Sequence, residues 1–235
     1  MRILAVDTSS SVAAVAVLDG SKLAGEYLLD HKKNHSQKFM PMIDEILKSL
    51  ELKPADIDVF AAGIGPGSFT GLRIGVTTIK AMAVAAKKPV VSIPTLDSLA
   101  YNLYPFAEFV CPIMDARNNQ VYTAVYKQDE SGQTKLTEYL GIPVSELVEL
   151  IKGKNIKAAF LGDAAPMHHD YLKKELGDNC SFAPAGLMTQ KASSVAQLAM
   201  LRAAKGELES CFDMVPFYLR KSQAEREYDK KNPGV

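Results

Sequence analysis

The sequence has few cysteines and no excess of charge of either sign. Cys111, Cys180 and Cys211 are an odd number, separated by 69 and 31 residues, which matches neither a metal ribbon nor a redox pair. We therefore expect reduced, buried thiols. Lys+Arg and Asp+Glu balance at 27 each, so no chain-wide basic field attracts nucleic acid. If the protein acts on RNA, we expect a partner to supply most of the contact.

Targeting and membrane segments are also missing from the pattern. Met1 leads directly into the strand-like RILAV, without a basic region followed by an apolar stretch and a cleavage site. No run approaches the roughly 18 apolar residues that span a bilayer. We therefore expect a cytoplasmic protein without membrane contact, and its 47% hydrophobic composition is ordinary for a folded domain.

The order of predicted elements indicates an α/β protein with an internal duplication. Three β-type runs, MRILAVD, VAAVAVLDG and KLAGEYLLD, precede a helix over 36–50, a strand over 58–62 and a helix over 68–88. From Phe109 three strands (FVCPIM, QVYTAVYK and TKLTEYLG), a helix and a strand repeat this order. The predicted divisions are an N-terminal subdomain with partner-binding helices over 1–104, a smaller C-terminal subdomain over 105–220, and a polar tail over 221–235.

The stretch GIGPGSFTGLRIG places five glycines in thirteen residues after a predicted strand. The Walker pattern fails because no Gly-Lys pair occurs there, and G-x-G-x-x-G fails in both registers. However, Gly67, Gly71 and Gly75 recur every four residues, so on a helix they share one face without side chains. Two interpretations stay open: close internal packing, or a face that binds another protein.

PGSFTGLRIG, with ILAVDTSS, HSQKFMPMI, DARNNQVY, FLGDAA and PFYLR, gives the sequence its resemblance to a known family. In that order the stretches resemble the TsaB (YeaZ) family across nearly the whole chain. The resemblance implies a duplicated actin-like ATPase fold (ASKHA, ribonuclease H-like), with a mixed sheet and helices in each subdomain. It also implies a role in forming threonylcarbamoyladenosine in tRNA, beside a larger TsaD-like catalytic homologue and a TsaE-like ATPase.

The resemblance further implies which role this chain carries. The larger relative has a metal-binding H-x-x-x-H, where this sequence has Thr95 and Leu99, and leucine cannot ligate a metal. His31 and His35 are four residues apart, but no third ligand follows from their spacing. We therefore expect a non-catalytic subunit with no catalytic residue, cofactor or metal. A metal-dependent transferase or glycoprotease-like peptidase, and a small-molecule kinase, remain as alternatives.

A vestigial nucleotide cleft is predicted at the turns that open the two units, together with the strand ends that carry Asp7 and Asp163 in opposite halves. Its residues are Asp7, Thr8, Ser9, Asp115, Arg117 and Asp163. The hydroxyls of the first turn either bind phosphate or cap the turn. Arg117 either contacts an anion or pairs with Asp115 within an ordinary hairpin turn.

A partner surface is predicted on the helices over 36–50 and 68–88. It consists of His35, Phe39, Met40, Ile43, Leu47, Gly67, Phe69, Gly71, Leu72, Arg73, Gly75, Thr78 and Met82. We expect this surface to bind the TsaD-like homologue and, in its absence, a second copy of the chain. tRNA is then contacted indirectly, through the complex.

Overall fold

The first unit of the protein is built on a five-stranded mixed sheet. The structure, a computed structural model, describes residues 1–30 and 35–220, with side chains from residue 38 onward in the second range. The strand order is β3-β2-β1-β4-β5, in which β1 pairs antiparallel with β2 and parallel with β4. The strands are β1 (Arg2–Asp7), β2 (Val12–Asp19), β3 (Lys22–Asp30), β4 (Val59–Gly65) and β5 (Val90–Pro94).

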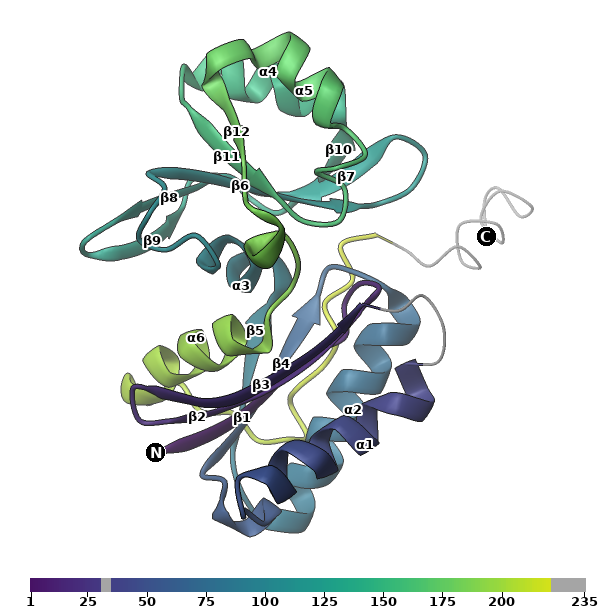
Figure 1. Cartoon of the computed structure of the whole chain (residues 1–235), viewed down its shortest axis with the longest axis vertical. Helices are drawn as coiled ribbons and strands as arrows, with labels where there is room; N and C mark the ends of the chain where they lie inside the picture. The colour runs from purple at the N-terminus through teal and green to yellow at the C-terminus, as the bar shows by residue number, and fades with distance from the viewer. Residues whose placement is uncertain (31–34, 221–235) are drawn as a thin grey trace.

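Two helices cover one face of this sheet (Figure 1). They are α1 (His35–Ser49) and α2 (Phe69–Ala86), with the short 3-10 helix η1 (Pro54–Asp56) between them. The Ser68 side chain caps α2 by accepting a hydrogen bond of 3.3 Å from the Gly71 amide. Left-handed Lys87 ends it. Both helices agree with the sequence prediction within two residues at each end.

The second unit repeats the topology of the first. Its sheet follows the order β10-β7-β6-β11-β12, in which β6 takes the place of β1, and β8 and β9 form an added hairpin beside β6. The elements are β6 (Phe109–Asp115), β7 (Gln120–Thr123), β8 (Tyr126–Asp129), β9 (Gly132–Lys135), β10 (Leu140–Pro143), α4 (Val144–Lys154), β11 (Ala158–Leu161), α5 (His169–Leu176), η2 (Gly177–Asn179), β12 (Cys180–Phe182) and η3 (Ala185–Leu187). The predicted duplication is therefore present.

Two of the predicted second-unit strands are divided differently in the structure. QVYTAVYK separates into β7 and β8, because β6 pairs with β7 near its end at Asp115 and with β8 near its start at Phe109. TKLTEYLG separates into the end of β9 and the beginning of β10. The buried residues Ala124 and Val125 connect β7 with β8.

The last helix of each unit packs on the sheet of the other unit. On α3 (Thr95–Tyr101), Leu96 and Leu99 pack with Val110 of β6. On α6 (Ala192–Ala204), buried residues pack with Ile3, Ala5 and Val91 of the first sheet. The predicted division at 104/105 is therefore wrong for α6, which lies against the first sheet (Figure 1). An apolar helix face does not reveal from sequence which of two sheets it covers.

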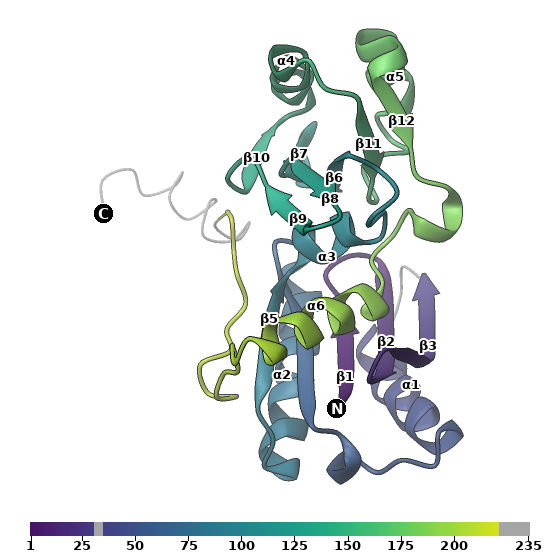
Figure 2. The ribbon, with the colours of Figure 1, turned by 90° about the vertical axis from the view of Figure 1, so that its left-hand side faces the viewer.

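The chain after α6 also belongs largely to the first unit. We call residues 209–220 the C-terminal strap. Cys211 and Met214 are buried in the first core, and the strap runs along the side of the first unit toward the second (Figure 2). The predicted assignment of this segment to the C-terminal subdomain is wrong for the same reason as for α6. The predicted tail over 221–235 lies outside the described residues.

Helix α2 has the length of a membrane span. Among residues 1–30 and 35–220 it is the one helix that is long and apolar enough to cross a membrane. Its 18 residues have a mean hydropathy of 1.2, and 33% of them are buried. It is not an unbroken run of 18 apolar residues, because Arg73 and Lys80 interrupt it. Core helices pass the same test, and Leu72, Val76 and Ile79 of α2 lie in the first unit's interior.

Candidate functional site

The turn after β1 directs its polar groups into the protein. Asp7, Thr8 and Ser9 are all buried. Oδ1 of Asp7 accepts hydrogen bonds from the Ser9 amide at 2.8 Å and from Ser9 Oγ at 2.6 Å. Thr8 Oγ1 donates to the Gly71 carbonyl at 2.8 Å. The hydroxyls of Thr8 and Ser9 therefore stabilise the turn and its contact with α2, which favours the capping interpretation.

The glycine face of α2 receives this turn. A Cβ atom added to Gly71 would lie 1.9 Å from the Thr8 carbonyl oxygen, and one added to Gly75 would lie 2.4 Å from Thr8 Oγ1. At Gly67 it would lie 2.3 Å from the Ser9 carbonyl oxygen. The expectation that these three glycines present an open face to a partner is wrong, because the backbone of the same chain fills it. The interpretation as internal packing is confirmed.

The Asp7 carboxylate is held in an environment that disfavours its charge. Burial raises its pKa to about 6, and the two hydrogen bonds from Ser9 oppose that rise. Its second oxygen, Oδ2, has no hydrogen-bond partner among the described residues. It lies 2.3 Å from the point where a Cβ atom added to Gly63 would be. Within the described residues no group of three or more His, Cys, Asp or Glu side chains is arranged so that it could hold a metal ion. Asp7 is thus packed against backbone.

The turn that opens the second unit is built differently. Arg117, Asn118 and Asn119 are three successive non-glycine residues with positive φ, at 64°, 55° and 56°. The backbone amide of Arg117 donates to Asp115 Oδ1 at 2.7 Å, so the predicted pairing of these residues involves the amide. The Asp115 amide in turn donates to Asp163 Oδ1 at 3.1 Å. Burial raises the pKa of Asp163.

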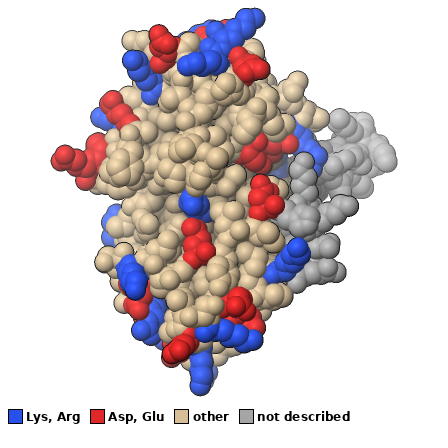
Figure 3. All heavy atoms as spheres, viewed as in Figure 1, with Lys and Arg blue, Asp and Glu red and all other residues tan. Residues whose placement is uncertain are grey.

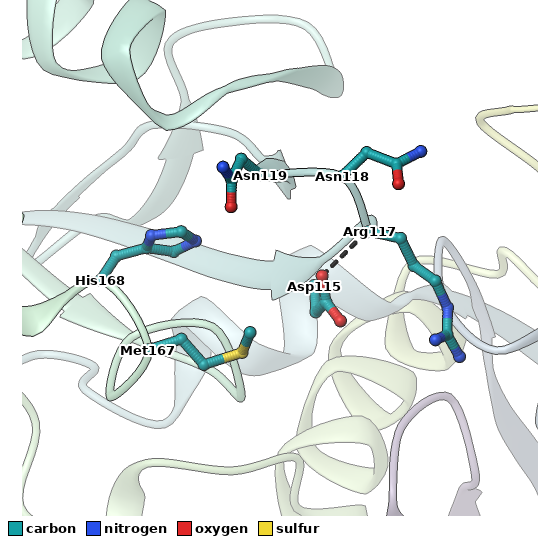
Figure 4. A pocket seen from close by; sticks show the side chains of 6 residues that line it. All are labelled: Asp115, Arg117, Asn118, Asn119, Met167 and His168. Atoms are coloured by element: carbon teal, nitrogen blue, oxygen red, sulfur yellow. Dashed lines mark hydrogen bonds between the residues drawn. The ribbon is translucent and has the colours of Figure 1, made fainter.

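This second turn borders an open cavity of about 540 Å³. Its lining residues are Asp115, Arg117, Asn118, Asn119, Met167 and His168. Figure 4 shows the His168 ring on the side of Asn119, whereas the Arg117 side chain extends away from His168. All six residues come from the second unit. The predicted vestigial cleft is therefore divided: Asp7, Thr8 and Ser9 are enclosed, while Asp115 and Arg117 border the cavity and Asp163 lies beneath the turn.

Thr95 and Leu99, which stand where the larger relative has its metal-binding histidines, lie in the protein interior. Thr95 Oγ1 accepts a hydrogen bond of 3.0 Å from the Gly65 amide, and Leu99 is fully buried in the core around α3. These two side chains thus connect α3 with the β4–α2 turn and the second sheet. His31 and the side chain of His35 lie outside the described residues, and with them the predicted histidine pair.

The residues predicted for the partner surface fall into two groups. Phe39, Ile43, Leu47 and Leu72 are buried in the structure, so the expectation that they face a partner is wrong. Their helical spacing marks the core-facing stripe instead. Met40 and Arg73 are exposed, and Phe69, Thr78 and Met82 are half-buried. For these five, binding to a partner stays a prediction.

Sequence reasoning missed Tyr218 of the C-terminal strap. Its ring stacks on Phe69 with centroids 4.1 Å apart, and Arg73 Nε donates to its hydroxyl at 3.0 Å. The sequence contained a signal, since PFYLR was one of the stretches that carried the resemblance. Nothing local in PFYLR indicates that it returns to α2.

Comparison with known proteins identifies the family. The profile of the family described as TsaD, tRNA N6-adenosine threonylcarbamoyltransferase, matches residues 29–228. The tRNA threonylcarbamoyladenosine biosynthesis protein TsaB of Bacillus subtilis is 32% identical over 228 residues, which cover 97% of this chain and 98% of that protein. The chain is a member of the TsaB (YeaZ) family. The Escherichia coli protein of the same name is 36% identical over 134 residues, covering 56% of this chain and 58% of that protein.

Solved structures agree on the fold. A Pseudomonas aeruginosa protein described as uncharacterized, with similarity to peptidase YEAZ, has a TM-score of 0.81 at 25% identity and covers 93% of this chain and 99% of its own. ROK hexokinase from Thermus thermophilus has a TM-score of 0.53 at 12% identity, with coverage of 86% and 100%. That second likeness concerns the fold alone. The predicted duplicated actin-like α/β fold is confirmed.

Proposed function

We propose that this protein takes part in making threonylcarbamoyladenosine in tRNA as an accessory subunit that does not transfer the group itself. The enclosed first turn is the observation that carries the proposal. In the actin-like fold this turn is a phosphate-binding element, but here the carbonyls of Thr8 and Ser9 lie against Gly71 and Gly67. Thr8 and Ser9 are buried, and their hydroxyls donate to the Gly71 carbonyl and to the Asp7 carboxylate of the same chain. The buried Leu99, which cannot ligate a metal, supports the same role.

The proposed partner is a TsaD-like transferase, bound on the outer side of α1 and α2. Met40 is 49% exposed there although it is a large apolar residue. The half-buried Thr78 and Met82 of α2 are further candidates for the contact. In the absence of the transferase we propose that the same surface binds a second copy of the chain, so the two assemblies exclude each other. A TsaE-like ATPase joins the complex as a further component.

The charge distribution supports indirect contact with tRNA. The formal net charge is +0, and on the face shown in Figure 3 acidic and basic side chains are interspersed. A protein that grips tRNA by itself generally presents a basic patch or stripe. We therefore propose that the transferase supplies most of the phosphate contacts. We also propose that the complex acts in the cytoplasm.

A reconstituted transfer assay tests this function. Purified chain, purified TsaD-like transferase and both together are incubated with a TsaE-like ATPase, an activated threonylcarbamoyl donor and unmodified tRNA, and the modified nucleoside is measured. We expect no product with this chain alone and more product with both proteins than with the transferase alone. Product from this chain alone would contradict the accessory role and favour the alternative of an independent transferase.

A further inference from the structure

The C-terminal strap is a third connection between the two units. The chain first crosses from α3 to β6 and then from β12 to α6. Figure 2 shows the β12–α6 connection on one side of the molecule and the strap on the opposite side. Motion about the first two connections would therefore separate the units most at the side that the strap covers.

The first part of the strap is fixed firmly to the first unit. Val90 and Glu209 exchange two backbone hydrogen bonds of 3.0 and 2.9 Å. Met214 is fully buried in the first core, and Lys80 Nζ of α2 donates to its carbonyl at 2.8 Å. Residues 209–214 are thus anchored by burial as well as by hydrogen bonds.

The next residues of the strap close over the turn between β4 and α2. The Phe217 amide donates to the Ile64 carbonyl at 2.7 Å. The Phe217 carbonyl oxygen lies only 2.2 Å from where a Cβ of Gly65 would be, and the Tyr218 ring stacks on Phe69. The strap therefore covers the turn that leads into α2.

The end of the strap reaches the second unit through half-buried side chains. The Phe217 ring lies 5.5 Å from the Tyr139 ring, in a tilted arrangement. Arg220 Nη1 donates to the carbonyl of Ala116 at 3.2 Å, within the turn that opens the second unit. The Arg220 side chain also lies beside β10, where its Cδ is 3.4 Å from the position that a Cβ of Gly141 would take. Phe217 and Arg220 are half-buried, whereas Met214, which fixes the strap to the first unit, is fully buried.

We propose that residues 217–220 form a releasable clasp that sets the angle between the two units. The clasp holds the β4–α2 turn of the first unit close to the turn that opens the second unit. The contacts to Tyr139 and Ala116 break first because Phe217 and Arg220, which make them, are only half-buried, whereas Met214 is fully buried in the first core. The units then rotate about α3 and α6, which stay packed on the opposite sheets. This inference concerns the conformation of the chain and goes beyond the accessory role proposed above.

Distance measurement between spin labels tests the clasp. Labels are attached at Glu45→Cys on α1 and Ser145→Cys on α4, both exposed, while the native Cys111, Cys180 and Cys211 are buried. Labelled chain is diluted with an excess of unlabelled chain, so that distances between two copies are not measured. With the strap intact we then expect one narrow distance distribution by pulsed electron paramagnetic resonance. In the variant Phe217→Ala/Arg220→Ala we expect a second, longer distance.

A second variant of the strap serves as the control for this experiment. Phe212→Ala removes a side chain that is 76% exposed, and it should leave the single distance unchanged. Unaltered circular dichroism and a protected Cys211 thiol establish that each variant is folded and anchored. If the double variant does not fold, Arg220→Ala alone decides. An unchanged distance in the folded clasp variant, or a longer distance in Phe212→Ala as well, overturns the proposal.

Discussion

The carbonyl oxygen of Thr8 occupies the space in which a side chain at Gly71 would begin. A Cβ atom at Gly71 would lie 1.9 Å from that oxygen, which belongs to backbone and cannot rotate away. The Thr8 side chain meanwhile donates to the carbonyl of Gly71 itself. The first turn and α2 are therefore fitted to each other at backbone level.

Replacing Gly71 by alanine should destabilise the protein. We expect the free energy of unfolding to fall by about 3 kcal/mol or more, at the upper end of what overpacking produces. Urea denaturation measures it. Gly153→Ala is the matched control, because Gly153 lies in α4 with no atom within 4 Å of its Cβ position, and alanine there should be neutral or stabilising. Equal stability of the two variants would contradict the tight packing.

The Asp7 carboxyl should make stability depend on pH. Its pKa is about 6 in the folded protein against an ordinary 3.8, so its contribution to stability is fully present below about pH 4 and is lost as the pH rises through 6. Asp7→Asn removes this loss. We expect it to stabilise the protein by up to about 3 kcal/mol at pH 8, from a pKa difference of about two units, and to have little effect at pH 4.

Asp58→Asn supplies the control of opposite sign for that measurement. The hydrogen bond from the Arg2 amide lowers the pKa of Asp58, so its contribution to stability is present at neutral pH and is lost as the pH falls below its ordinary pKa. The variant should be less stable than the parent protein at pH 8 and equal to it at low pH. Denaturant titrations over a pH series check both variants, and parallel curves for Asp7→Asn and the parent would refute the account of Asp7.

An acidic residue at position 40 should weaken the proposed assemblies. Met40→Glu places a charge in an exposed apolar position of α1. We expect at least a tenfold weaker binding of the TsaD-like transferase and of a second copy, measured by sedimentation and calorimetry, because a charge buried at an interface without a partner is strongly unfavourable. Leu201→Glu on α6 is matched in exposure, at 50%, and should leave both assemblies intact. Loss of binding in Leu201→Glu alone would place the surface elsewhere.

A shared carboxylate should contribute to the attachment of the two units. Tyr126 and Tyr139 of the second unit donate to the same oxygen of Asp97 on α3, at 2.7 and 2.8 Å. Tyr126→Phe removes one of these bonds, and we expect a loss of about 1.5–3 kcal/mol, as for hydrogen bonds to a charged group. Tyr171→Phe on the surface of α5 should change stability by less than about 0.5 kcal/mol. Thermal unfolding compares the two variants.

Sequence reasoning predicted those features of the fold that depend on local pattern. The cap at Ser68, the length of α2 and the repeated order of strands and helices follow from periodicity and capping, which act within a few residues. The four-residue spacing of Gly67, Gly71 and Gly75 predicted a close backbone approach. It did not specify the approaching chain, because the Thr8 turn lies some sixty residues earlier in sequence.

The candidate site was predictable only in part. Asp7 ends β1, Asp115 ends β6 and Asp163 follows β11 by two residues, and the ends of strands follow from local pattern. Whether each is enclosed or open depends on neighbours from other elements, such as Gly63 against Asp7. Phe39 and Ile43 were assigned to a partner surface because an apolar stripe has the same spacing in both cases. The sheet that buries it is not part of the helix sequence.

The reciprocal placement of α3 and α6 means that neither half of this chain is a complete folding module. A cut between residues 104 and 105 would leave the first sheet without the helix that covers its second face, and the second sheet without α3. Each fragment would expose an apolar sheet surface to water. Mixed together, the two fragments would each supply the other's missing layer, so the protein should be recoverable by complementation from pieces that are insoluble apart.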